Sequence, residues 1–171
     1  ISFSSGKGGA GKTLCSVNFA SELVSKGYKV LVFDIDINCS NVFILLQVKP
    51  QSKLQQYFEG NITLKDCVLN SPFNIDVISA GVNIQKLLPF ESDFYLSKLA
   101  NDLKTLSDEY DYVIIDYAAG ITQSMIKFYD ISDDIILVAK PEITSLTDLY
   151  RLIKMICSDK IAEKLYLIVN K

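Results

Sequence analysis

The glycine-rich segment GKGGAGKT constrains this chain more than any other feature, because it lies between a short apolar run and a segment with helical periodicity. Gly6, Gly11, Lys12 and Thr13 have the spacing G-x-x-x-x-G-K-[ST]. Glycines let backbone N–H groups converge on phosphates, while the lysine reaches the terminal phosphates and the threonine ligates Mg²⁺. The following helix adds the positive end of its dipole. The motif therefore predicts a loop that binds Mg·ATP, in preference to an ordinary glycine-rich turn.

Short β-branched or aliphatic runs alternate with helix-period segments along the rest of the chain. Most runs are continuously apolar, which is typical of strands in a parallel sheet that helices cover on both faces. The predicted strands are residues 1–5, 29–34, 74–79, 112–116, 134–139 and 164–169. We therefore expect the α/β class, with a mainly parallel twisted sheet flanked by helices on both faces. With 171 residues, 49% of them hydrophobic, the chain is interpreted as one domain over residues 1–171.

Helices are predicted where apolar residues recur with the 3.6-residue period of one helix face. The three longest sets are Leu14, Val17, Ala20 and Val24; Leu96, Leu99, Leu103 and Leu106; and Leu146, Leu149, Ile153 and Ile156. Gly27 is expected to end the first helix, and Ser92 or Asp93 to begin the second. Two shorter helices are predicted, the first around Leu54, Tyr57 and Phe58 and the second around Leu64, Cys67 and Val68.

The composition excludes several kinds of chemistry. The chain has no histidine, which excludes Ser-His-Asp and Cys-His catalysis and every histidine-containing zinc site. Its 17 basic and 20 acidic residues give a net charge of −3, which does not favour nucleic acid as a partner. Cys15, Cys39, Cys67 and Cys157 form no CxxC pair, so we expect reduced thiols in or near the core of a cytoplasmic protein.

The two ends of the chain lie in strand-like runs. The sequence begins without Met at Ile1, and it stops at Lys171 directly after the last predicted strand. It contains neither a secretory signal nor an apolar run long enough to span a bilayer. We therefore expect a core domain that is trimmed at both ends.

Aspartates lie at the ends of two predicted strands. Asp34 and Asp36 close the segment VFDID, and Asp116 closes YVIID. A strand that ends in aspartate brings a carboxylate to the carboxyl edge of the sheet, beside the phosphate loop. One such acid could equally cap a helix or be solvated, but three of them favour a single Mg²⁺ site. From their charges, we expect Asp116 to hold a water molecule that is bound to Mg²⁺ and Asp34 to be a second outer-sphere acid.

A second lysine, Lys7, follows the first glycine of the loop, and taken alone it would be a solvated loop residue. The segment KGGAGKT resembles the deviant Walker A motif of the MinD/ParA family of P-loop NTPases, and the resemblance extends over essentially the whole chain. It implies that Lys7 reaches across an ATP-dependent homodimer to the partner's phosphates. The family usually has Val in place of Ala10. The loop residues implied in nucleotide binding are Gly6, Lys7, Gly8, Gly9, Ala10, Gly11, Lys12, Thr13 and Leu14.

Later segments carry the same resemblance. DIDINCSN resembles switch I, which implies that Asp36 orients the attacking water and that Asn41 contacts the nucleotide. DYAAG resembles switch II, which implies that Gly120 approaches the γ-phosphate. VAKPEITSLTDLY and LIVNK resemble the later strands, which implies that Pro141 borders the nucleotide and that Asn170 binds adenine.

Within the family, DIDINCSNVFILL, LKDCVLNSPFNIDVISAGVNIQKL and PEITSLTDLY most resemble the flagellar-number regulators FlhG/FleN and their MinD neighbours. This implies an ATPase that hydrolyses Mg·ATP slowly and dimerises with ATP. It also implies a protein partner in flagellar or division control. The expected location is the cytoplasm, with peripheral attachment to the cell membrane only through segments outside this chain.

Other functions remain open at this level. One is a ParA-type partition ATPase, and another is a nucleotide-binding scaffold without turnover, which only Ala118 supports, because switch II usually has Pro or Gly there. A reductase like the nitrogenase iron protein is disfavoured, because the cysteine that ligates its cluster is replaced by the segment Tyr117-Ala118-Ala119. A protein kinase is disfavoured because its glycine-rich loop is of another type.

Overall fold

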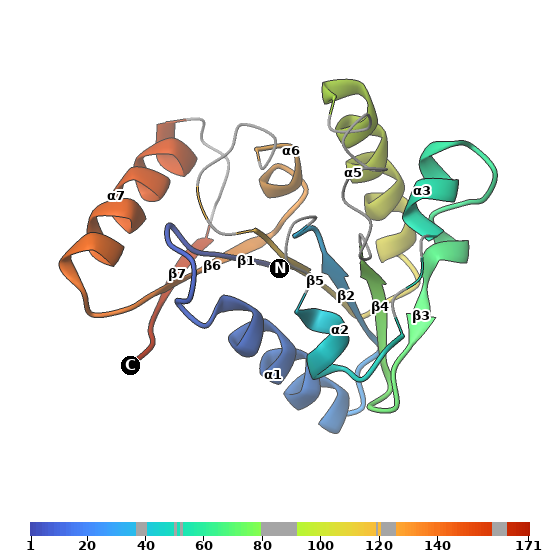
Figure 1. Cartoon of the computed structure of the whole chain (residues 1–171), viewed down its shortest axis with the longest axis horizontal. Coiled ribbons are helices and arrows are strands. Elements are labelled where there is room, and N and C mark those ends of the chain that lie inside the picture. Colours follow the sequence, from blue (N-terminus) through green and yellow to red (C-terminus); the bar gives the residue numbers. More distant parts are fainter. Residues whose placement is uncertain are drawn as a thin grey trace.

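A seven-stranded sheet forms the centre of the protein, with the strand order β3-β4-β2-β5-β1-β6-β7 (Figure 1). The structure, a computed structural model, describes residues 1–36, 41–49, 51, 53–79, 92–118, 120, 126–158 and 164–171. The strands are β1 Ser2–Ser4, β2 Val30–Asp34, β3 Leu69–Asn70, β4 Ile75–Ser79, β5 Tyr112–Asp116, β6 Asp134–Ala139 and β7 Lys164–Val169. All neighbouring strands are parallel except β3, which pairs antiparallel with β4.

All the strands predicted from apolar runs are confirmed, with bounds that agree to within a residue or two. β3 is a strand that the sequence did not predict. It is only two residues long, Leu69–Asn70, so it is too short to show a repeating pattern. It lies at the outer edge of the sheet, beside β4.

Helices cover both faces of the sheet, as predicted (Figure 1). On one face α1, Lys12–Ser25, and α2, Val42–Leu45, pack on the sheet through a cluster that contains Phe3 and Val32. On the other face lie α3 Lys53–Phe58, α5 Asp93–Ser107, α6 Ile126–Tyr129 and α7 Ile143–Ser158. These four helices share a larger cluster with Phe33 and Leu137. The second predicted short helix is a 3₁₀ turn, Lys65–Cys67.

Two residues of the predicted helix faces are exposed instead of buried. Leu14 is 52% exposed because it lies in the first turn of α1, ahead of the part of the helix that packs on the sheet. Leu146 is 46% exposed, and the buried stripe of α7 contains Leu149, Leu152 and Ile156. The period was therefore correct, but the start of each buried face was wrong by about one turn.

The ends of α1 and α5 are close to the predicted positions. Gly27 follows α1 in the left-handed region, with φ 89°, where glycine has no steric penalty. Its N–H donates to the Val24 carbonyl, and the N–H of Tyr28 donates to that of Leu23. Ser92 occupies the position before α5, but its side chain makes no capping hydrogen bond.

The cysteines have different environments. Cys67 is buried and Cys15 is partly buried, but Cys157 is exposed, so the prediction of a thiol in or near the core is wrong for Cys157. Cys39 lies outside the described residues. Among the residues that the structure describes, no helix has the length and apolar character needed to cross a membrane.

The parallel strands direct the predicted site residues to one edge of the sheet. β1, β2, β5 and β6 run in the same direction, so their carboxyl ends lie together. The glycine-rich loop follows β1, while Asp34 ends β2 and Asp116 ends β5. Asn170 follows β7 at the same edge. Ligands bind at this edge of open α/β sheets.

Candidate nucleotide-binding site

The glycine-rich loop forms a cavity of about 340 Å³ at the carboxyl edge of the sheet. Its lining combines the loop with the start of switch I. The lining residues are Ser5, Gly8, Gly9, Ala10, Gly11, Lys12, Thr13, Leu14, Asp36 and Asn41. The structure thus brings together most of the predicted loop residues and both predicted switch I residues. Gly6, Lys7, Asp34, Asp116, Gly120, Pro141 and Asn170 are not in this lining.

Two glycines of the loop are required by close packing, and one of them, Gly11, also by its backbone conformation. Gly11 has φ 89°, and a side chain there would collide with the amide nitrogen of Asn170. A Cβ on Gly6 would lie 2.6 Å from the backbone carbonyl carbon of Asp148 in α7. The loop therefore follows a path that a side chain at either position would block.

The first residue of α1 is Lys12, directly after the loop. The first hydrogen bond across this junction runs from the Cys15 N–H to the Gly11 carbonyl at 2.9 Å. The amides that precede it, beginning with Lys12, belong to the turn whose N–H groups have no partner within the helix. These donors and the helix dipole favour an anion in the cavity.

Lys12 and Asp116 form a buried ion pair beneath the loop. The Lys12 Nζ lies 2.7 Å from Asp116 Oδ1, and the two side chains are 7% and 1% exposed. Nζ also donates to Thr13 Oγ1 at 3.3 Å. The residues predicted to bind phosphate and the metal's water are therefore in direct contact. Burial raises the pKa of the neighbouring Cys15 thiol, and the Asp116 charge raises it further, so this thiol stays protonated.

Asp34 is adjacent to Asp116, because the two residues are partners in the β2–β5 register. Asp34 Oδ1 accepts a hydrogen bond from the Asp36 N–H at 3.0 Å, and Oδ2 accepts one from Ser79 Oγ at 3.4 Å. Asp34 therefore also holds the start of switch I in place, a role that the sequence did not indicate. Within the described residues, no group of three or more Cys, Asp or Glu side chains could hold a metal ion.

The segment that resembles switch II begins at Asp116. The Gly120 N–H donates to the Ser5 carbonyl at 3.2 Å, which places this glycine beside the entry to the loop. Gly120 has φ 105°, a backbone conformation that side chains rarely adopt. Ala118 packs against the larger hydrophobic cluster. Ala119 lies outside the described residues.

Lys7 points away from the cavity and contacts the start of α7. Its Nζ donates to Thr144 Oγ1 at 2.9 Å and lies 3.4 Å from Glu142 Oε2. The side chains of Lys7 and Glu142 are 44% and 52% exposed, so water weakens their attraction. Pro141, which precedes α7, is exposed and does not line the cavity.

Asn170 is held against the loop by two hydrogen bonds. Its backbone N–H donates to the Ala139 carbonyl at 2.8 Å, and its side-chain amide donates to the Ala10 carbonyl at 3.0 Å. The sequence missed the roles of Ser79 and Thr144, because hydrogen bonds between residues far apart in the chain leave no local signal. Thr144, for example, lies 137 residues after Lys7.

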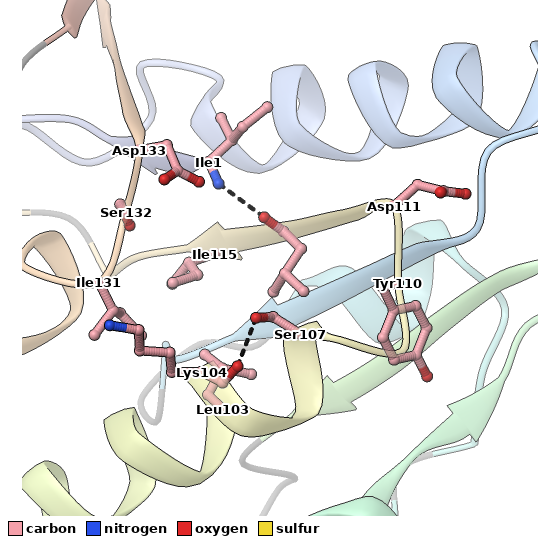
Figure 2. A pocket seen from close by; sticks show the side chains of 11 residues that line it. Ile1, Leu103, Lys104, Ser107, Tyr110, Asp111, Ile115, Ile131, Ser132 and Asp133 are labelled. Atoms are coloured by element: carbon pink, nitrogen blue, oxygen red, sulfur yellow. Dashed lines mark hydrogen bonds between the residues drawn. The ribbon is translucent and has the colours of Figure 1, made fainter.

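A smaller cavity of about 160 Å³ opens at the amino edge of the sheet (Figure 2). Figure 2 shows Lys104 and Ser107 of α5 on one side of this cavity and Asp133 on the other. The Ile1 amino group donates to the Val113 carbonyl at 2.9 Å beside it. None of the predicted site residues lines this cavity, so the candidate site is the one at the loop.

Comparison with known proteins gives matches over nearly the whole chain. Residues 1–167 match the family described as AAA domain. The antiactivator FleN of Pseudomonas aeruginosa is 35% identical over 159 residues, which cover 93% of this chain and 56% of FleN. The flagellum site-determining protein YlxH of Helicobacter pylori is 31% identical over 170 residues, which cover 99% of this chain and 57% of YlxH.

A solved structure agrees with this fold. It is the septum site-determining protein MinD of Pyrococcus horikoshii complexed with Mg-ADP. The TM-score is 0.84 at 30% sequence identity, and the match covers 99% of this chain and 69% of that one. The chain spans little more than half the length of FleN and YlxH.

Proposed function

Because the chain belongs to the MinD/ParA family of P-loop ATPases, we propose that it binds Mg·ATP, hydrolyses it slowly and dimerises in the ATP state. The observation that carries the proposal is the buried contact of Lys12 with Asp116 directly beneath the glycine-rich loop. Lys12 and the N-terminus of α1 meet there at one cavity, and the Asp116 carboxylate contacts Lys12 from outside the cavity lining. This combination suits a nucleotide whose phosphates carry Mg²⁺.

The residues present fit the nucleotide and its metal. A side chain at Gly11 would collide with Asn170, so this position of the loop accepts only glycine. The first turn of α1, whose N–H groups have no partner within the helix, lines the cavity. Thr13 would ligate Mg²⁺ through its hydroxyl, and Asp34 and Asp116 would hold water molecules bound to it. When bound, Mg²⁺ neutralises the charge on the phosphate oxygens.

The chain's own groups rearrange when phosphates enter. Lys12 would then contact the terminal phosphates in place of Asp116, and the Asp116 carboxylate would be available to hold a water molecule of the metal. Asp36 lies at the cavity wall, where its carboxylate can orient the attacking water. The hydrogen bond from its N–H to Asp34 holds it at that position. Asn41, which lines the cavity, and Asn170, whose side-chain amide donates to the Ala10 carbonyl of the loop, would border the nucleotide.

Dimerisation uses Lys7. We expect this lysine to leave Glu142 and Thr144 and to reach the phosphates of a second protomer across a two-fold interface. The pair with Glu142 is about half exposed, so its loss costs at most about 1 kcal/mol. ATP then favours the dimer more than ADP does, because the γ-phosphate adds negative charge opposite Lys7.

The cellular role follows from the relatives. FleN is named as an antiactivator, YlxH as flagellum site-determining and MinD of Bacillus subtilis as septum site-determining. These names favour control of flagella or cell division through a protein partner, over a role in plasmid or chromosome partition. Attachment to the inner face of the cell membrane would require segments outside this chain.

Phosphate release tests the proposal directly. The complete protein should release phosphate from ATP with Mg²⁺ and cease to do so when Mg²⁺ is chelated, whereas its Lys12→Ala variant should be inactive in both conditions. ATP binding without any phosphate release would favour a nucleotide-binding scaffold. Failure to bind ATP at all would reject the proposal.

A further inference from the structure

Strand β1 carries two serines in the middle of the sheet. Ser2 and Ser4 are both 0% exposed, and they lie on the face opposite to Phe3, since side chains alternate along a strand. A buried hydroxyl is costly unless it has a hydrogen-bond partner. On this face the partners include the hydroxyls of two tyrosines, Tyr117 and Tyr129, which are themselves 0% exposed, and Ser2 also pairs with the Ser132 hydroxyl.

The four hydroxyls form two hydrogen bonds, which join β1 to Tyr117 directly after β5 and to Tyr129 in α6. Tyr129 OH donates to Ser4 Oγ at 2.7 Å, and Ser2 Oγ donates to Tyr117 OH at 3.4 Å. The two tyrosine rings pack on each other with their centroids 4.7 Å apart. Burial raises the pKa of Tyr129 to about 12, so its hydroxyl remains a donor at neutral pH.

One contact lies within the segment 116–120 that resembles switch II, and the other lies after it. Tyr117 directly follows Asp116, and Tyr129 ends α6, the helix after switch II. The backbone of β1 holds the same segment, because the Tyr117 N–H donates to the Phe3 carbonyl and the Gly120 N–H to the Ser5 carbonyl. Three consecutive residues of β1 and its end therefore form these hydrogen bonds: Phe3 with Tyr117, Ser4 with Tyr129 and Ser5 with Gly120. The phosphate loop begins at the next residue.

We propose that Ser4 and Tyr129 are positioning residues, whose hydrogen bond sets the place of switch II relative to the phosphate loop. The inference rests on the proposed ATPase function. The proposed function requires Asp116 and Gly120 to lie against the nucleotide. Asp116 has a short side chain and Gly120 has none, so the backbone of this segment has to be placed correctly. A hydroxyl pair is directional, whereas an apolar contact at the same position would leave α6 free to slide along β1.

A core role alone would not need these hydroxyls. Phenylalanine in place of Tyr129 would keep the ring packed on Tyr117, and alanine in place of Ser4 would remove the other polar group. Tyr57 provides a matched control, because it is also a buried tyrosine of the same cluster, and its hydroxyl donates to Asp102 at 2.6 Å. It belongs to α3, at the β3 side of the sheet (Figure 1).

The experiment compares Tyr129→Phe, Ser4→Ala, the double variant and Tyr57→Phe in the complete protein. Tyr129→Phe should lower kcat about tenfold while KM for ATP changes less than about twofold, since one buried hydrogen bond is lost from the arrangement needed for turnover. The Gly120 amide should exchange with deuterium faster. The double variant should lose no more kcat than the worse single variant, because the two hydroxyls act on each other. Tyr57→Phe should lower the stability of the protein but change neither kcat nor the exchange rate of the Gly120 amide.

The outcomes separate this inference from the proposed function. If the parent protein turns over ATP and Tyr129→Phe retains both its kcat and its Gly120 exchange, the positioning role is overturned. The same conclusion follows if Tyr57→Phe lowers kcat equally, because a general loss of stability then explains the result. If the parent does not turn over ATP, the proposed function fails. Faster Gly120 exchange in Tyr129→Phe would still support the positioning of switch II.

Discussion

Lys12 and Asp116 lie 2.7 Å apart in the interior, although one begins α1 and the other ends β5. Each supplies the charge that the other needs when no phosphate is bound, since an unpaired charge in the interior is strongly destabilising. Under the proposed function, phosphate binding would change the partner of Lys12 and so free the Asp116 carboxylate. The pair would then link nucleotide binding, metal binding and the stability of the empty protein.

The Lys12→Ala variant should bind Mg·ATP too weakly to measure by calorimetry, because the charge that offsets the phosphates is gone. It should also lose about 3–5 kcal/mol of unfolding free energy in urea, since Asp116 stays buried without its partner. The control is Lys26→Ala, whose lysine pairs with Glu22 on the surface of the same helix. An unchanged ATP affinity in Lys12→Ala would refute the assignment of the phosphate loop.

The Asp36→Ala variant should keep most of its affinity for Mg·ATP but release phosphate at least about a hundredfold more slowly. Orienting the attacking water stabilises the transition state more than it stabilises bound ATP. Asp36 lines the cavity in which the proposed function places the terminal phosphate and the attacking water. Single-turnover phosphate release measures the effect, and a parental rate would remove Asp36 from the mechanism.

Two variants of Asp34 separate its charge from its hydrogen bond. Asp34→Asn keeps an oxygen that can accept the Asp36 N–H, so it should raise the Mg²⁺ concentration for half-maximal activity and leave kcat within about threefold. Asp34→Ala removes that acceptor as well, and its kcat should fall by a further factor of about ten because Asp36 loses its anchor. Equal kcat in the two variants would show that the hydrogen bond does not position Asp36.

The cysteines should differ in their rate of alkylation at pH 8. Burial raises the pKa of Cys67 from 9.0 to about 11, which lowers its thiolate fraction at this pH about a hundredfold. Cys157 is exposed and should react first. Peptide mapping after brief iodoacetamide treatment measures both rates. Labelling of Cys67 as fast as Cys157 would mean that the cluster around α3 opens readily.

The sequence predicted the layers of the fold because buried parallel strands leave continuous apolar runs, such as VLVFD in β2. It also predicted that Asp34 and Asp116 share one edge, since parallel strands end together. It could not predict which side chains form ion pairs or hydrogen bonds with each other. The pairing of Lys12 with Asp116 spans 104 residues, and that of Tyr129 with Ser4 spans 125. Such contacts depend on tertiary packing, which no local pattern records.

The exposed lysine of the loop gives the last prediction. Within the described residues, the Lys7 ammonium group contacts Thr144 and Glu142, and Lys7 does not line the cavity. Under the proposed mechanism, it contributes to catalysis only by moving. In the Asp36→Ala background, light scattering should detect a dimer of the complete protein in ATP and a monomer in ADP. Adding Lys7→Ala should abolish the dimer, while calorimetry still detects ATP bound through Lys12 and Thr13.

Glu142→Gln sharpens this test, because it weakens the contact that holds Lys7 in its own chain and leaves the lysine intact. It should lower the protein concentration at which half of the protein is dimeric in ATP by about two- to fivefold, as expected from the loss of a half-exposed ion pair. The matched control is Lys26→Ala, which removes an exposed lysine directly after α1 and should leave dimerisation unchanged. A dimer that survives Lys7→Ala would show that another group bridges the protomers. A monomer in ATP for every variant, including the Asp36→Ala parent, would reject the switch mechanism itself.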